Sequence, residues 1–151
     1  MTDYTELANE LRAISEDVKY SVSILSNASA LLYENMEELN WCGFYLSTGK
    51  KLVLGPFQGK IACTAIDYGA GVCGTAYSRN ETVLVKDVHC FDGHIACDSA
   101  SNSEIVVPIH VKGRIFGVLD IDSPRLERFD ERDKEGLEKV VSVLENILNG
   151  L

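Results

Sequence analysis

Long hydrophobic runs and clusters of basic residues are both missing from this sequence. No apolar stretch approaches the ~18 residues that a membrane-spanning helix needs, and the first residues, Met1-Thr2-Asp3-Tyr4, do not begin a signal peptide. Lysine and arginine number 14 against 23 aspartate and glutamate residues, which gives a net charge of −9. Because binding to a nucleic-acid backbone requires clustered positive charge, we expect no binding to nucleic acids. The lack of a long apolar run and of a signal peptide leads us to expect a cytoplasmic protein that does not bind membranes.

Paired metal-ligand spacings are missing as well. The five cysteines stand at positions 42, 63, 73, 90 and 97. The residues that could be read as zinc ligands are His89, Cys90, His94 and Cys97. Without a pair at a familiar spacing, we expect no metal at these or at other residues. An odd number of cysteines without an export signal also argues against a structural disulfide framework, which leaves catalytic or redox roles as the alternatives to plain packing.

What is present is an ordinary share of hydrophobic residues, 46% of 151, in a pattern that changes its period near residue 41. Helical spacing predicts a short helix over residues 4–14 and a longer one, capped by Ser15 or Asp17, with an apolar stripe from Ile24 to Leu39. The period of two that follows predicts strands. We expect strands at 41–46, 51–54, 61–67, 82–85, 104–111 and 114–122, a short helix at 75–79 and a closing helix capped by Asp130.

This order of elements predicts an α+β fold: an antiparallel β-sheet of about six strands, with N-terminal helices and a C-terminal helix packed on it, in a single domain over residues 1–151. The long helices would cover one side of the sheet, and the loops around Cys73 and Cys97 would cover the other and enclose a small pocket. Residues 55–59 should end the second strand, because Pro56 cannot donate to a ladder of hydrogen bonds.

The last two predicted strands meet at Lys112-Gly113. If these two residues formed the whole turn, Ile105 would face Asp120, and Glu104 would point to the opposite side of the sheet from Asp120. A site that uses both acids therefore requires a bulge or a longer turn. Proline in a sheet is confined to edges, strand starts and bulges, so Pro108 marks a place for such a bulge.

Two loops carry residues suited to chemistry. The glycine-rich residues 69–74 precede a predicted helix, whose free N–H groups favour an anion; because the Walker ending is absent, we expect a small carboxylate rather than a nucleotide. Residues 93–104 place a thiol, two acids and an imidazole between apolar strands, where long loops are usually functional.

Three acids near the ends of the last strands complete the picture: Glu104, Asp120 and Asp122. Burying an acid in an apolar strand lowers the stability of the fold by roughly several kcal/mol unless the acid is neutralised, paired or hydrogen-bonded. Clustered carboxylates also raise one another's pKa, which leaves one protonated near neutral pH as a proton donor. Trp41 and Tyr45 share one strand face and are either core aromatics or the wall of a pocket for an apolar ligand group.

The sequence resembles the free methionine-(R)-sulfoxide reductases, which are built on a GAF domain, over about residues 24–148. The motifs that carry the resemblance are Asn40-Trp41-x-Gly43-Phe44-Tyr45-Leu46, Leu54-Gly55-Pro56-Phe57-Gln58-Gly59, Gly71-Val72-Cys73-Gly74-Thr75, Asp87-Val88-His89, Gly93-His94-Ile95-Ala96-Cys97-Asp98, Ser103-Glu104-Ile105-Val106 and Gly117-Val118-Leu119-Asp120-Ile121-Asp122. The resemblance implies reduction of the free amino-acid sulfoxide with electrons from thioredoxin and no other cofactor. It makes Cys97 the attacking thiol and Cys63 and Cys73 the candidates for disulfide formation.

The same resemblance makes Glu104, Asp120 and Asp122 pocket acids, and Trp41 and Tyr45 pocket aromatics. Cys42 and Cys90 lie outside its three-cysteine pattern, and we expect them to be structural or incidental. We expect Gly71, Val72 and Asp98 to complete the substrate site, with the substrate carboxylate on backbone N–H groups of the glycine-rich loop.

The residues support this chemistry. A thiolate at Cys97 would attack the sulfur of the sulfoxide, a neutral carboxylic acid would protonate the departing oxygen, and the sulfenic acid would condense with Cys63 or Cys73. Neighbouring carboxylates raise a thiol's pKa, and only His89 or His94 could lower it. Two alternatives remain, a GAF-type sensor of a small molecule and a thiol redox switch without turnover. The oligomeric state stays open, a homodimer included.

Overall fold

The computed structural model describes residues 1–94 and 99–151. Within them, the strands form a six-stranded sheet in the order β3-β2-β1-β6-β5-β4 with every neighbour antiparallel. The strands are β1 (Trp41–Ser47), β2 (Lys51–Gly59), β3 (Ala65–Asp67), β4 (Val83–Val85), β5 (Ser103–Val111) and β6 (Arg114–Ser123). The helices are α1 (Tyr4–Ser15), α2 (Ser21–Asn35), α3 (Gly71–Arg79) and α4 (Glu131–Asn149), with a 3-10 turn, η1 (Val88–Cys90). The α+β fold and its antiparallel sheet are confirmed.

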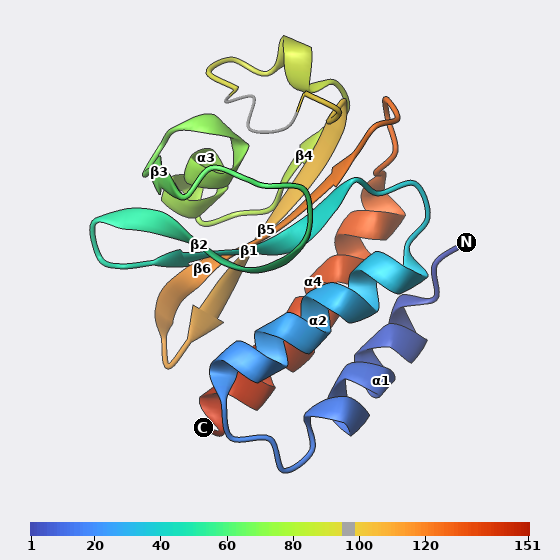
Figure 1. The fold of residues 1–151 in the computed structure, drawn as a ribbon, viewed down its shortest axis with the longest axis vertical. Coiled ribbons are helices and arrows are strands. Elements are labelled where there is room, and N and C mark those ends of the chain that lie inside the picture. Colours follow the sequence, from blue (N-terminus) through green and yellow to red (C-terminus); the bar gives the residue numbers. More distant parts are fainter. Residues whose placement is uncertain (95–98) are drawn as a thin grey trace.

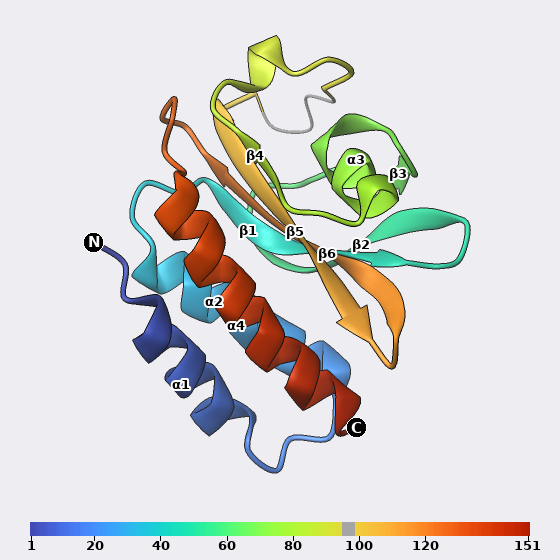
Figure 2. The same ribbon diagram turned by 180° about the vertical axis from the view of Figure 1, so that it is seen from behind.

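The helices are divided unequally between the two faces of the sheet. Helices α2 and α4 lie against one face and α1 packs outside them, whereas the short helix α3 lies on the other face (Figure 1). Figure 2 shows the same division from behind. Among the described residues, no helix combines the length and the apolar character that crossing a membrane would require.

Alternation along β1 builds both faces at once. Cys42 and Phe44 join the apolar core under α1, α2 and α4, while Trp41 and Tyr45 join a second cluster under α3. This is the division that the period of two predicts, because successive side chains on a strand point to opposite faces.

The N-terminal cap expected from the sequence is present at α4 and is absent at α2. Asp130 caps α4 in a capping box with Asp133, as predicted, and the hydroxyl of Tyr4 donates to Asp133 to tie α1 to this end. At α2 the N-cap is Tyr20 without a side-chain bond, so capping by Ser15 or Asp17 was wrong. Ser15 ends α1, and Asp17 has a positive φ of 61° in the connection between the helices.

Strand β2 does not stop at Pro56. The strand pairs with β1 on both sides of a register shift, Tyr45 facing Leu54 and Gly43 facing Phe57. The proline sits within this irregular stretch, and a bulge tolerates a residue that lacks an N–H donor. Strand β3 is conversely shorter than predicted, Ala65–Asp67, which leaves Cys63 in the loop before it.

The bulge required for a shared acid site is present. Beyond the two-residue turn, Val111 faces Arg114 and His110 faces Ile115, but Ile109 faces Gly117. One extra residue of β6 shifts the register by one, next to the position expected from Pro108. Glu104 therefore faces Asp122 across the ladder rather than Ile121, and the acids share one face.

Candidate functional site

A small pocket of about 40 Å³ lies between the sheet and α3. Its walls come from β1, β5, β6, the first turn of α3 and the loops beside them. The predicted site residues that line it are Trp41, Tyr45, Gly71, Val72, Cys73, Glu104, Asp120 and Asp122. Five residues that were not predicted also line it: Ala62, Ile66, Ala70, His94 and Ser101. Two predicted site residues of the loop over residues 93–104, Cys97 and Asp98, lie outside the described residues.

The cysteines fall into different environments. Cys63 is disulfide-bonded, whereas Cys42, Cys73 and Cys90 are free. Cys42 is buried in the apolar core on the helix-covered face, and Cys90 is exposed, with its thiol 3.5 Å from Oδ2 of Asp87. Neither of these two lines the pocket. Cys73, at the start of α3, is 4% exposed and lies inside it.

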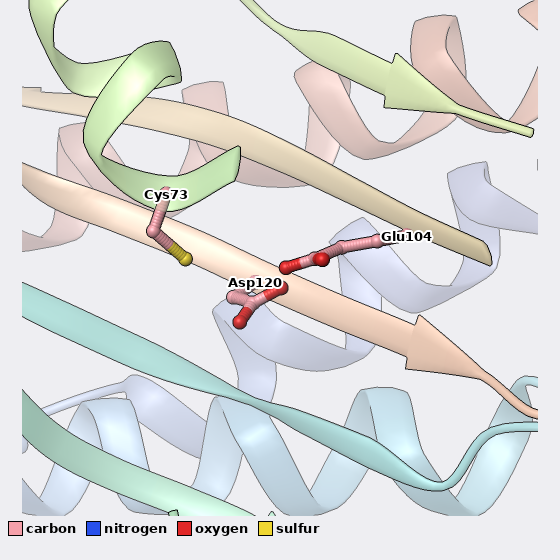
Figure 3. A group of neighbouring side chains, drawn as sticks. All are labelled: Cys73, Glu104 and Asp120. Carbon is pink, nitrogen blue, oxygen red and sulfur yellow. The ribbon is translucent and has the colours of Figure 1, made fainter. Parts of the chain in front are cut away.

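Cys73 and two of the acids point toward one another from three elements, as Figure 3 shows. One ligand atom from each of Cys73, Glu104 and Asp120 lies within 4.8 Å of the other two. Glu104 is on β5, and Asp120 is two residues from Asp122 on β6, so the ladder register and strand alternation bring all three acids to one face. Their exposed fractions are 6%, 5% and 9% for Glu104, Asp120 and Asp122.

Burial decides the protonation of this group. Removal from water, and then the negative charge of Asp120, raise the pKa values of Glu104 and Asp122 well above the ordinary range. These two carboxyls therefore keep their protons to a higher pH than exposed acids do. Burial, and then the negative charge of Asp120, likewise raise the pKa of the Cys73 thiol, so Cys73 is a thiol rather than a thiolate.

A hydrogen-bonded chain orients Asp122. The amide of Asn40 donates to the hydroxyl of Ser101 over 3.0 Å, and that hydroxyl donates its hydrogen to Oδ2 of Asp122 over 3.2 Å. Oδ2 is therefore an acceptor, and the proton of neutral Asp122 belongs on Oδ1. Within the described part of the chain, Oδ1 is buried and has no hydrogen-bond partner outside the group of acids.

The aromatic wall has a second role that the sequence did not indicate. Trp41 stacks between Tyr45 and Phe57, with ring centroids 5.8 and 5.1 Å apart. Its indole N–H donates to the carbonyl of Lys60 over 3.2 Å, and the hydroxyl of Tyr45 donates to the carbonyl of Cys63 over 2.8 Å. The pocket wall thus holds the loop that carries Cys63.

The glycine-rich loop begins α3 four residues earlier than predicted, at Gly71. Gly71 has a positive φ of 63°, and a Cβ on Gly74 would come within 2.5 Å of the carbonyl oxygen of Asp67, so both positions favour glycine. The N-cap, Ala70, has no side-chain hydrogen bond. The first N–H groups of α3 therefore remain for an anion beside the pocket.

His94 is a poor source of positive charge for a nearby thiolate. Burial, and then the charge of His89, lower the pKa of His94, which keeps its imidazole neutral near pH 7. Of the zinc set considered from the sequence, His89, Cys90 and His94 do not form a compact group, and Cys97 lies outside the described residues. Among the described residues, the compact group is Cys73, Glu104 and Asp120.

Comparison with known proteins agrees with this site. The family model described as "GAF domain" matches residues 7–148. The free methionine-R-sulfoxide reductase of Escherichia coli is 53% identical over 145 residues, 96% of this chain and 88% of the relative. The structure of fRMsr of Staphylococcus aureus in complex with substrate is 52% identical, with a TM-score of 0.93 and coverage of 98% of this chain and 97% of that one.

A third relative was also solved with its substrate. The X-ray structure of the free methionine-R-sulfoxide reductase of Neisseria meningitidis has a TM-score of 0.92 at 44% identity and covers 96% of this chain and 87% of that one. With full-length relatives at this identity, the chain belongs to the GAF-domain family of free methionine-R-sulfoxide reductases.

Proposed function

We propose that this protein reduces the (R) epimer of free L-methionine sulfoxide to methionine by thiol chemistry. The family supports the reaction and its epimer. The observation that carries the proposal is the pocket itself, in which an aromatic wall is combined with two buried acids whose pKa values are raised. A sulfoxide needs both, because its methyl group is apolar and its oxygen leaves only when protonated.

The chemical step begins at Cys97, the proposed nucleophile. Its thiolate attacks the sulfoxide sulfur while Asp122 or Glu104 protonates the oxygen. Transfer of that oxygen to the cysteine leaves methionine, with its sulfur reduced by two electrons, and a sulfenic acid on Cys97, oxidised by two electrons. The proposed donor atom on Asp122 is Oδ1, because Ser101 already donates to Oδ2.

The remaining groups of the pocket fit the two charged ends of a free amino acid. The substrate carboxylate would accept from the N–H groups of Gly71 and Val72 at the start of α3. The ammonium of the substrate would bind Asp120 and Asp98. The Oδ1 atom of Asp120 is buried and has no partner among the described residues. Because both ends are held inside the pocket, the free sulfoxide should react and a sulfoxide within a peptide should not.

We propose Cys63 as the resolving thiol. The Cys63 sulfur attacks the sulfenic sulfur of Cys97, a disulfide forms and water leaves. Two observations favour Cys63 over Cys73: Cys63 is the cysteine in a disulfide here, and Cys73 is free and buried. Thioredoxin would then reduce the disulfide, which places the cycle in the reducing cytoplasm and requires no other cofactor.

The test follows NADPH oxidation with thioredoxin and thioredoxin reductase. Free methionine-(R)-sulfoxide should be turned over, whereas the (S) epimer and a peptide with an internal methionine sulfoxide should not. Binding of the sulfoxide without NADPH loss would instead identify a sensor. Oxidation of the cysteines by peroxide, with no methionine formed from the sulfoxide, would identify a redox switch.

A further inference from the structure

We propose that Cys73, Glu104 and Asp120 form a binding site for a thiophilic divalent cation such as Zn²⁺, and that the bound cation blocks the substrate pocket. The three side chains come from α3, β5 and β6 and converge on one point (Figure 3). A ligand atom of each lies within 4.8 Å of the other two. This inference rests on the proposed function for its inhibitory role but not for the binding itself.

The donor set suits zinc. One sulfur and two carboxylate oxygens are common zinc ligands, with typical bond lengths of about 2.3 Å to sulfur and about 2.0–2.2 Å to oxygen. Side-chain rotations that draw the three atoms together would create such a site. A fourth, tetrahedral position would be left for water. Binding of the cation would release the thiol proton of Cys73 to solvent, and the resulting thiolate selects Zn²⁺ or Cd²⁺ over Mg²⁺ and Ca²⁺, which prefer oxygen alone.

An unsatisfied atom points to a ligand at this place. Asp120 is 5% exposed, and its buried Oδ1 has no hydrogen-bond partner within residues 1–94 and 99–151. A carboxylate oxygen withdrawn from water without a partner is costly, and a cation on Oδ1 would supply the missing interaction. Asp120 lines the pocket, on the side of the sheet where the substrate would bind.

The site exists in the oxidised protein. Cys73 is free while Cys63 is disulfide-bonded, so the catalytic disulfide does not consume the sulfur that the cation needs. A cation held by Glu104 and Asp120 would remove both acids from contact with the substrate. Substrate and cation would therefore exclude each other.

The experiment measures Zn²⁺ binding to the oxidised full chain by competition with a chromophoric chelator. One Zn²⁺ should bind per chain. Cys73→Ser should weaken binding at least about tenfold, since even groups outside the ligand shell contribute about 10- to 100-fold. Cys42→Ser, a buried free cysteine on the other face, and Cys90→Ser, an exposed one, should bind as the unchanged protein does. Equal binding by Cys73→Ser, or loss of binding in Cys90→Ser, would overturn the site.

Two further measurements need no variant at a catalytic acid. Cd²⁺ added to the oxidised protein should produce an ultraviolet thiolate-to-metal absorption band that Cys73→Ser lacks; a band of equal strength in that variant contradicts sulfur ligation by Cys73. Free methionine sulfoxide should raise the apparent Kd for Zn²⁺, while glycine at the same concentration should not. No displacement would overturn the inhibitory role, and the thioredoxin-coupled assay reports separately on whether the chain is a reductase.

Discussion

On the helix-covered face of the sheet, β6 buries Leu119 and Ile121 among apolar side chains, whereas on the α3 face the same strand buries Asp120 and Asp122. Successive residues of one strand thus belong to a core and to a reactive pocket. The first face gains stability from each buried side chain. The second face loses stability because acids are removed from water. The same burial raises the pKa values of these acids, so that they can act as proton donors to a sulfoxide.

The largest expected effect is the loss of the proposed nucleophile, compared with the loss of a cysteine in the apolar core. Cys97→Ser should abolish methionine release even in a single turnover, because no other thiol is proposed as nucleophile. Cys42→Ser, on the helix-covered face, should release methionine as before. The measurement is methionine formed per enzyme without reductant. A stoichiometric amount from Cys97→Ser would move the nucleophile to Cys73.

The second prediction concerns the buried acids and pH. The pKa of Glu104 is raised in the folded protein, while a glutamate in an unfolded chain has a pKa of about 4.3. Between these values the folded state of this group binds more protons than its unfolded state. The contribution of Glu104 to the free energy of unfolding is therefore fully present below about pH 4 and is lost as the pH rises through the raised pKa. The slope is at most about 1.4 kcal/mol per pH unit for each such group, and Asp122 adds to it in the same sense.

Glu104→Gln should flatten this slope, measured by urea unfolding at several values between about pH 5 and pH 8, and should slow the chemical step by about 10²-fold or more if Glu104 donates the proton. The matched control is Leu119→Ala, on the other face of β6. It should lower the free energy of unfolding by about 2–5 kcal/mol without changing the slope. An unchanged slope in Glu104→Gln would show that this carboxyl titrates normally.

How much of this contrast the sequence could predict depends on the range of the interaction. The period of two separated Trp41 and Tyr45 from Cys42 and Phe44 correctly, because alternation is a local property of any strand. Turn length and alternation also indicated that Glu104 and Asp120 could share a face only with a bulge or a longer turn, and β6 contains a bulge.

The misses depend on contacts with partners distant in the sequence. Pro56 lacks a donor and therefore indicated a strand end, but a register shift against β1 accommodates it. The glycines at the start of α3 have a low helix propensity, so the predicted helix began too late. A glycine is nevertheless required at position 74, because a Cβ there would collide with the carbonyl oxygen of Asp67. The bonds from Trp41 and Tyr45 to the carbonyls of Lys60 and Cys63 carry no sequence signal, because any residue offers a carbonyl. The roles of the site residues remain predictions.

A smaller effect is expected from the hydroxyl that orients Asp122. Ser101→Ala leaves Oδ2 of Asp122 without its donor, so the acidic proton is no longer confined to Oδ1. The single-turnover rate should fall about tenfold, the equivalent of one hydrogen bond of about 1.4 kcal/mol. Ser101→Thr should restore it. Ser103→Ala is the matched control: its hydroxyl donates to the carbonyl of Arg125 instead, so it should lose stability but not rate. Equal rate losses in both alanine variants would reduce Ser101 to a structural role.

The smallest expected effect tests whether the aromatic wall acts on the resolving thiol. Tyr45→Phe keeps the ring that stacks on Trp41 and removes only the hydroxyl bonded to the carbonyl of Cys63. A neutral hydrogen bond contributes about 0.5–1.5 kcal/mol, so the loop that carries Cys63 should become a few-fold less well positioned. Release of the first methionine does not use this hydroxyl, which is bonded to the Cys63 carbonyl, and should keep its rate. Formation of the disulfide, followed by loss of free thiols after one addition of sulfoxide, should slow by about two- to tenfold. If methionine release slows and disulfide formation does not, the hydroxyl of Tyr45 acts on the substrate rather than on the Cys63 loop.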